Sequence, residues 1–144
     1  MREILFRGKR IDSREWVEGG YRHEKVGEYL TAVLIIEPLT MGVWENHRVN
    51  PETVGQFTGL TDKNGKRIFE GDIVEGHIHS QWRHDVQRCV VAYGRDGFEC
   101  RHHIGGIDTP FYTYRVMFSK DVAVIGNIHD NPELLEVEHE DKQR

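Results

Sequence analysis

The sequence predicts a mainly β protein, and three observations lead to this fold class. The 144 residues include 15 glycines, and Gly, Asn, Asp and Pro recur at a spacing of roughly eight to twelve residues. Turn residues at that spacing are typical of short strands joined by tight turns. Between the turns lie short runs rich in β-branched and aromatic residues. Apolar residues at helical spacing are almost lacking, and the length suits one domain or two small, closely packed ones.

Four strands are predicted in the first 50 residues, separated by turns. The third is the most apolar of them, and Glu37-Pro38 closes it because proline has no backbone N–H to donate to a sheet. Asn50-Pro51 closes the fourth in the same way. The predicted strands cover Ile4–Gly8, Trp16–Tyr21, Tyr29–Ile36 and Trp44–Val49.

Clearer turn signals divide the second half into further strand segments. Asn64-Gly65 lies between strand-like flanks and is a strong hairpin signal, because both central residues of the expected turn must accept positive φ. The residues Gly-Arg-Asp-Gly at 94–97 mark a second hairpin. The predicted strands cover Val54–Leu60, Ile68-Phe69, Ile73–Ile78, Val86–Tyr93, Phe98–Ile104 and Asp121–Ile128.

Two local patterns carry more specific expectations. In Glu70-Gly71-Asp72 the glycine supplies a backbone bend, and the Asp72 carboxylate can accept hydrogen bonds from the turn amides. We therefore assign Asp72 a structural role. Asn131-Pro132-Glu133 predicts a short C-terminal helix, with Asn131 as N-cap and Pro132 at the first helical position.

The charge balance does not favour nucleic acid as a ligand. The net charge is −5, and the last fourteen residues hold five acidic and two basic side chains. The rest of the chain is therefore close to neutral, whereas phosphate neutralisation by Lys and Arg dominates nucleic-acid affinity. The acidic end, residues 138–144, is expected to be a solvated tail.

The distribution of apolar residues predicts a cytoplasmic protein without membrane partners. A membrane span needs roughly 18 uninterrupted apolar residues, but the longest run ends at Glu37. The first ten residues lack the apolar segment of a secretory signal. In this compartment Cys89 and Cys100 are expected to be reduced, partly buried thiols that a hairpin can bring near each other.

Motifs of common enzyme classes are missing from the sequence. None of the serines, Ser13, Ser80 and Ser119, lies in a Gly-x-Ser-x-Gly elbow, and neither cysteine is part of a Cys-x-x-Cys pair. Glycine-rich phosphate-binding patterns do not occur either. We therefore expect a non-enzymatic protein that needs no cofactor.

Nine histidines keep one enzymatic alternative open, a metal-dependent enzyme that uses a histidine cluster. His77 and His79 are two residues apart, so on a strand both imidazoles lie on one face, and Cys100 and His102 are related in the same way. Three or four such nitrogen and sulfur ligands make a zinc site. No compact metal signature accompanies them, and exposed histidines on strands and a loop are the plainer interpretation.

Aromatic residues in polar surroundings are candidate contacts for a protein partner. Trp82 lies in the polar stretch 80–84, and Phe111, Tyr112 and Tyr114 follow a proline. Trp and Tyr give large buried areas at a small entropic cost, which makes them frequent interface residues. The alternative is that these segments fold back and cover the β core.

Several blocks of the sequence belong together as a set. They are Arg2–Lys9, Trp16–Tyr21, Val49–Lys66, Ile68–Val74 and Val124–Leu135. Together they resemble the YopX family, in the order in which that family has them. They span residues 2–135, so the resemblance covers nearly the whole chain.

The resemblance implies a protein encoded by a bacteriophage or prophage, with an SH3-like barrel in its C-terminal part. It brings no established activity and no catalytic or binding residues. With the strand pattern it predicts an N-terminal β region over 1–50 packed on an SH3-like barrel over 51–137, which ends in the short helix, and an acidic tail over 138–144. The stretches 24–48 and 77–120 depart from the family blocks, so features individual to this protein are expected there.

The predicted function is that of a phage or prophage accessory protein in the host cytoplasm, which binds a phage or host protein and forms homo-oligomers. Open strand edges and exposed aromatic residues favour self-association. Two alternatives stay open: nucleic-acid binding in phage DNA metabolism, and the metal-dependent enzyme.

Overall fold

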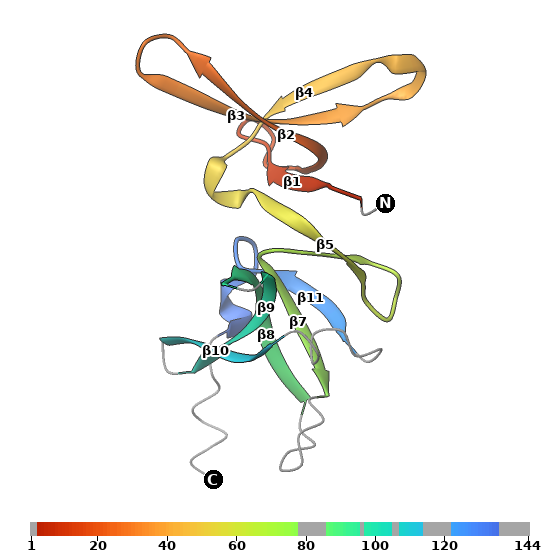
Figure 1. The fold of residues 1–144 in the computed structure, drawn as a ribbon, viewed down its shortest axis with the longest axis vertical. Coiled ribbons are helices and arrows are strands. Elements are labelled where there is room, and N and C mark those ends of the chain that lie inside the picture. Colours follow the sequence, from red (N-terminus) through yellow and green to blue (C-terminus); the bar gives the residue numbers. More distant parts are fainter. Residues whose placement is uncertain (1–2, 78–85, 96, 105–106, 114–121, 136–144) are drawn as a thin grey trace. The chain divides into compact units, whose positions relative to one another are not determined.

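The computed structural model describes residues 3–77, 86–95, 97–104, 107–113 and 122–135. Within them the chain is mainly β, as predicted, and its helical parts are short 3-10 turns (Figure 1). No helix of this described part is long and apolar enough to cross a membrane. The strands are β1 Phe6–Lys9, β2 Trp16–Val26, β3 Leu30–Pro38, β4 Trp44–Arg48, β5 Gly55–Thr61, β6 Arg67–Phe69, β7 Asp72–His77, β8 Val86–Gly94, β9 Gly97–Ile104, β10 Ile107–Thr113 and β11 Ala123–Asn127. The 3-10 turns are η1 Thr40–Gly42, η2 Pro51–Thr53 and η3 Pro132–Leu135.

The chain divides into two units, which we call the N-terminal unit (Met1–Gly59) and the C-terminal unit (Leu60–Arg144). The boundary falls inside β5, later along the chain than position 51, where the sequence placed the start of the second domain. The described strands form two sheets, with the strand orders β4-β3-β2-β1-β5-β6 and β10-β9-β8-β7-β11.

In the N-terminal unit a long hairpin, β2–β3, pairs its two strands all the way to Val26 and Leu30. From the sequence, β2 is predicted to end at Tyr21. The residues beyond Tyr21 are held in the strand by the backbone ladder to β3, although almost none of their side chains is buried. Apolar packing is concentrated further in, where Val33, Ile35 and Val49 form the core with Phe6, Val17 and Val54 around them.

Backbone hydrogen bonds link the end of β4 to the end of β1. Arg10 and Val49 form an isolated antiparallel bridge, and the N–H of Ile11 donates to the carbonyl of Arg48 at 3.1 Å. The N–H of Asn50 donates to the carbonyl of Lys9 at 2.9 Å. At the C-terminal end of β4, the edge that faces away from β3 is therefore already hydrogen-bonded to residues that follow β1.

The C-terminal unit has its core between β6, β7, β8, β9 and the residue before β11. The core residues are Ile68, Val74, Cys89, Val91, Cys100 and Val122. Among the described residues its five-stranded sheet is open, with β10 at one edge and β11 at the other. The closed barrel that the family resemblance implied is not seen in this part.

Strand β10 is not among the strands predicted from the sequence, where Phe111 and its neighbours are either a partner contact or a segment that covers the β core. It pairs antiparallel with β9, from Ile107 opposite Ile104 to Thr113 opposite Glu99, with an irregularity after Pro110. A proline argues against a central strand but is compatible with an edge strand. The edge position of β10 is the physical reason why this sequence forms a strand.

The hairpin predicted at Asn64-Gly65 forms, but with a different turn. Gly65 has φ of +80°, whereas Asn64 is not among the residues with positive φ. The Asp62 N–H donates to the Lys66 carbonyl at 2.7 Å, so the loop has three residues. Asp62 organises it, since its Oδ1 accepts from the N–H groups of Asn64 at 2.9 Å and Lys66 at 2.8 Å.

The other two local patterns have different outcomes. Asp72 is buried and its Oδ2 accepts from the Phe69 N–H at 2.7 Å, which confirms the structural role predicted for its carboxylate. The predicted C-terminal helix is not confirmed, since among the described residues only the 3-10 turn η3 forms at this place. The Asn131 side chain accepts from the N–H of Asn127 at 3.3 Å, before the turn, instead of capping a following helix.

Candidate functional site

The β3–β4 hairpin of the N-terminal unit carries the side chains of the candidate site. β4 pairs antiparallel with β3, and residues 39–43 form the end of this hairpin (Figure 1). Glu37 on β3 lies directly opposite Glu45 on β4, and His47 lies opposite the fully buried Ile35. Because side chains alternate along strands, the two carboxylates and the imidazole lie on one face of the hairpin.

The three polar side chains meet around the Nε2 atom of His47. This atom is 2.8 Å from Oε2 of Glu37 and 3.8 Å from Oε2 of Glu45. One ligand atom from each side chain lies within 4.8 Å of the other two. The imidazole is only 4% exposed, whereas the side chains of Glu37 and Glu45 are 39% and 52% exposed. The buried Nε2 of His47 thus faces two carboxylates whose side chains reach solvent and can rotate.

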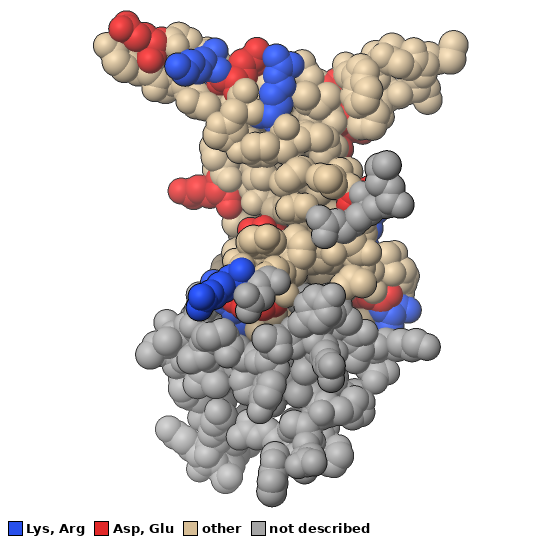
Figure 2. All heavy atoms as spheres, in the orientation of Figure 1, with Lys and Arg blue, Asp and Glu red and all other residues tan. Residues whose placement is uncertain are grey.

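The end of the same hairpin presents an apolar surface, which we call the hairpin end. Met41 is 97% exposed and has φ of 64°, a left-handed conformation that is unfavourable by about 1–2 kcal/mol for most non-glycine residues. No charged residue lies between Pro38 and Trp44, and Figure 2 shows this end of the molecule in tan only, at the top right. The exposed large apolar side chains are Leu39, Met41, Val43 and Trp44.

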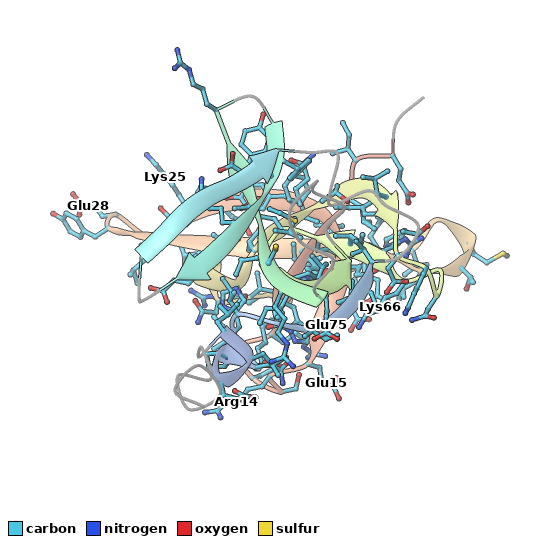
Figure 3. All side chains as sticks on the ribbon, turned by 90° about the horizontal axis from the view of Figure 1, so that it is seen from below. Arg14, Glu15, Lys25, Glu28, Lys66 and Glu75 are labelled. Carbon is cyan, nitrogen blue, oxygen red and sulfur yellow. The ribbon has the colours of Figure 1, made fainter. Side chains whose placement is uncertain are left out.

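The β2–β3 hairpin has a different end. It also exposes apolar side chains, those of Val26, Tyr29 and Leu30. Charged residues lie among them, however, and Figure 3 places Lys25 and Glu28 together at this end. The two hairpins diverge from the common strand β3, so the charged end and the uncharged end point in different directions (Figure 1).

Cys89 and Cys100 are free, buried thiols in the core of the C-terminal unit. The register of β8 and β9 places Cys100 opposite Val91, so Cys89 is its diagonal neighbour. The hydrogen bond between the two thiols lowers the pKa of Cys89, and together with burial it raises the pKa of Cys100. The pair is part of the core, as expected from the sequence for reduced thiols.

The residues predicted as partner and metal sites are described only in part. The side chain of Cys100 is placed, in the core beside Cys89. For four others the structure gives only the strand in which they lie, β10 for Phe111 and Tyr112, β7 for His77 and β9 for His102. Both predicted sites therefore stay predictions. The residues that lie outside the described part are Trp82, Tyr114 and His79.

Comparison with known proteins agrees with the sequence blocks. The profile of the YopX family, whose description is "YopX protein", matches residues 5–136. The chain belongs to the YopX family. The crystal structure of protein EF1440 from Enterococcus faecalis is similar at 27% sequence identity, with a TM-score of 0.52. The similarity covers 94% of this chain and 100% of that one. No curated protein matches.

The candidate site of this YopX-family protein was not found in the sequence. From the sequence, Glu37 is predicted only to end a strand, and the predicted metal ligands all lie in the second half of the chain. The missing signal was the register of the hairpin, since two strands joined by 39–43 place Glu37 opposite Glu45. The site lies in 24–48, one of the two stretches that depart from the family's sequence blocks.

Proposed function

We propose that this YopX-family protein is a non-enzymatic protein-binding module that self-associates through the hairpin end. The observation that carries the proposal is the set of four large apolar side chains exposed there, Leu39, Met41, Val43 and Trp44, without a charge among them. Large apolar side chains exposed together at one end of a hairpin are typical of interaction sites in soluble proteins.

The absence of charge at the hairpin end favours a second copy of the chain as the partner. In a twofold contact the same surface faces itself, so any charged side chain near the axis meets a like charge. The chain has a net charge of −5, which makes copies repel each other in general. The hairpin end avoids this repulsion, whereas the end of the β2–β3 hairpin carries Lys25 and Glu28.

Side chains, rather than sheet extension, carry the proposed contact. β4 is the outer strand of its sheet, but the Ile11 N–H already donates to the carbonyl of Arg48 on it. A partner strand therefore cannot pair along the whole of β4. Stable interfaces bury about 800 Å² per partner, more than one hairpin end offers, so we expect weak and concentration-dependent association.

The proposal includes the finer expectations from the sequence. They are a phage or prophage origin, a place in the bacterial cytoplasm, an SH3-like barrel in the C-terminal part, and a phage or host protein as a further partner. Trp82, Phe111, Tyr112 and Tyr114 remain the candidate contacts for that partner. The antiparallel pairing of five short strands in the C-terminal unit supports the barrel, because small β-barrels are built from such strands.

The test is sedimentation velocity over a wide range of protein concentration. We expect wild-type protein to form dimers as concentration rises, and the double variant Met41→Asn/Trp44→Thr to stay monomeric where wild type is dimeric. Asn tolerates the left-handed conformation and Thr suits a strand, so the variant should fold. Far-UV circular dichroism and thermal unfolding check this.

The matched control is Tyr29→Asn/Leu30→Thr, which removes two exposed apolar side chains from the other hairpin of the same unit. Its dimerisation should equal that of wild type. A wild-type protein that is monomeric up to millimolar concentration would overturn the proposal. So would a folded Met41→Asn/Trp44→Thr variant that dimerises as strongly as wild type.

A further inference from the structure

We propose that Glu37, Glu45 and His47 bind one zinc ion. None of its three residues belongs to the hairpin end, and all three lie on one face of the β3–β4 hairpin. Its ligand set is one imidazole nitrogen and two carboxylate oxygens, which are ordinary zinc ligands. The imidazole excludes the hard cations Mg²⁺ and Ca²⁺ as preferred occupants, since these take oxygen ligands.

The spacing of the ligand atoms suits a single ion. Two atoms bound to one tetrahedral zinc at about 2.1 Å lie about 3.4 Å apart. The distances from Nε2 of His47 to the carboxylate oxygens of Glu37 and Glu45, 2.8 and 3.8 Å, are on either side of that value. Both glutamate side chains reach solvent, so rotation of each can adjust these distances.

The direct opposition of two glutamates is a second, independent reason to expect a cation. Like charges opposite each other on neighbouring strands are destabilising. Among the described residues the only ion-pair partner of Glu37 and Glu45 is His47. Arg10 is within electrostatic range of Glu45, but its guanidinium is engaged by Asp12, with hydrogen bonds of 2.8 and 3.0 Å.

The buried imidazole provides the fixed part of the site. His47 is held opposite Ile35 in the strand, and its Nε2 points at both carboxylates. Such preorganisation lowers the entropic loss on binding, because only the two glutamates must be ordered. With three protein ligands, one coordination position is left for water or another ligand.

The rival interpretation is a purely structural cluster, in which the imidazole of His47 and the two carboxylates contact one another without a metal. The two interpretations differ in what added zinc does. A structural cluster does not respond to it, whereas a zinc site binds one equivalent through Nε2 of His47.

The experiment is calorimetric titration of Zn²⁺ into metal-free, tag-free full-length protein. The double variant Glu37→Gln/Glu45→Gln keeps the size of both side chains and removes both charges. We expect it to lose one equivalent of zinc, or to bind that equivalent at least tenfold more weakly. Wild type and variant have the same histidines. Zinc bound elsewhere on the protein therefore contributes equally to both titrations.

Glu24→Gln/Glu28→Gln is the matched control, since it removes the same charge from the other hairpin of the N-terminal unit. It should bind zinc as wild type does. The ¹⁵N resonance of His47 Nε2 should move on zinc addition in wild type and stay unchanged in Glu37→Gln/Glu45→Gln. Equal zinc binding by wild type and a folded double variant would overturn the proposal, as would a wild-type His47 resonance that does not respond.

Discussion

The two units place buried polar side chains in contrasting surroundings. In the C-terminal unit Asp62 accepts three backbone N–H groups, those of Asn64 and Lys66 and, through Oδ2, that of Val124 at 2.9 Å. In the N-terminal unit His47 is equally buried but faces two half-exposed glutamates. A carboxylate whose partners are backbone amides is bound into a turn and has little capacity left for a ligand.

The partners of a buried polar side chain therefore indicate whether it is structural or belongs to a candidate site. Backbone N–H groups that donate to a side chain cannot move without unfolding the turn. The side chain that accepts these hydrogen bonds therefore contributes to stability. Side-chain partners that reach solvent can change partners at a small energetic cost. Variants of the first kind should therefore change unfolding, and variants of the second kind should change binding. Four predictions test this comparison.

The largest effect is expected for Gly19→Ala in β2, which disturbs the pairing of β2 with β3 in the N-terminal unit. A Cβ atom on Gly19 would overlap the backbone carbonyl of Ile36, which cannot move without shifting β3. We expect a loss of about 3 kcal/mol or more in the free energy of unfolding. Amide exchange should show lost protection in β2 and β3, while β7 and β8 of the other unit keep theirs.

The neighbouring glycine is the control for this prediction. A Cβ atom on Gly20 would meet no atom within 4 Å, so Gly20→Ala should change stability by less than about 1 kcal/mol. Equal stability of the two variants would show that β2 and β3 adjust to the added methyl group. In that case the strands that hold the His47 cluster can shift at a small energetic cost.

The second prediction concerns Asp72→Ala in the C-terminal unit. The substitution leaves the buried N–H of Phe69 without the Asp72 carboxylate, and an unsatisfied buried donor is unfavourable by about 1–3 kcal/mol. We expect a loss of that size in urea unfolding and no change in zinc binding. An Asp72→Ala variant that loses zinc binding but keeps its stability would contradict the structural role of Asp72.

The third prediction uses the pH dependence of Asp62→Asn. Burial alone would raise the pKa of Asp62, but hydrogen bonds from the backbone of Val124, Lys66 and Asn64 prevail and lower it below its usual 3.8. The carboxylate therefore stabilises the fold fully above this value, and that contribution is lost as pH falls through the lowered pKa. We expect Asp62→Asn to be less stable than wild type by about 1–2 kcal/mol at neutral pH.

Thermal unfolding of wild type and Asp62→Asn at a series of pH values measures this effect. The gap between them should shrink on acidification, because protonated Asp62 also loses acceptor capacity. Asp12→Asn is the control, since the Asp12 carboxylate is fully exposed and its hydrogen bonds are to its near neighbours Arg10 and Ser13. A gap that stays constant down to strongly acidic pH would contradict the role given to the Asp62 charge.

Much of the fold could be predicted from the sequence, because turns with a chemical requirement leave local signals. Asn64-Gly65 and Glu70-Gly71-Asp72 both marked real turns, although a three-residue loop replaced the expected two-residue one. The elements that failed depend on partners distant in sequence. β10 contains Pro110 and forms a strand only because β9 is beside it, and the side chain of Asn131 bonds back to Asn127.

The candidate site could not be predicted for the same reason. Neither Glu37, Glu45 nor His47 belongs to a motif, and their proximity comes from the register of the hairpin. Of the metal ligands predicted from the sequence, Cys100 alone has a described side chain, which lies beside Cys89 in the core. Sequence spacing shows which residues share one face of a strand, but not which residues of the neighbouring strand lie opposite them, and Glu37 meets Glu45 only through that register.

The smallest effect is expected for Met41→Gly at the hairpin end, and it has the opposite sign. Glycine adopts the positive φ of this position without steric penalty, but it also makes the unfolded chain more flexible. We expect a gain in stability of less than about 1 kcal/mol, together with weaker dimerisation in sedimentation. Gly42→Ala, at φ of 74° in open space, is the converse control and should lose about 1 kcal/mol. A clear loss of stability in Met41→Gly would mean that the exposed methionine supports the fold, and its conformation would then no longer point to a contact surface.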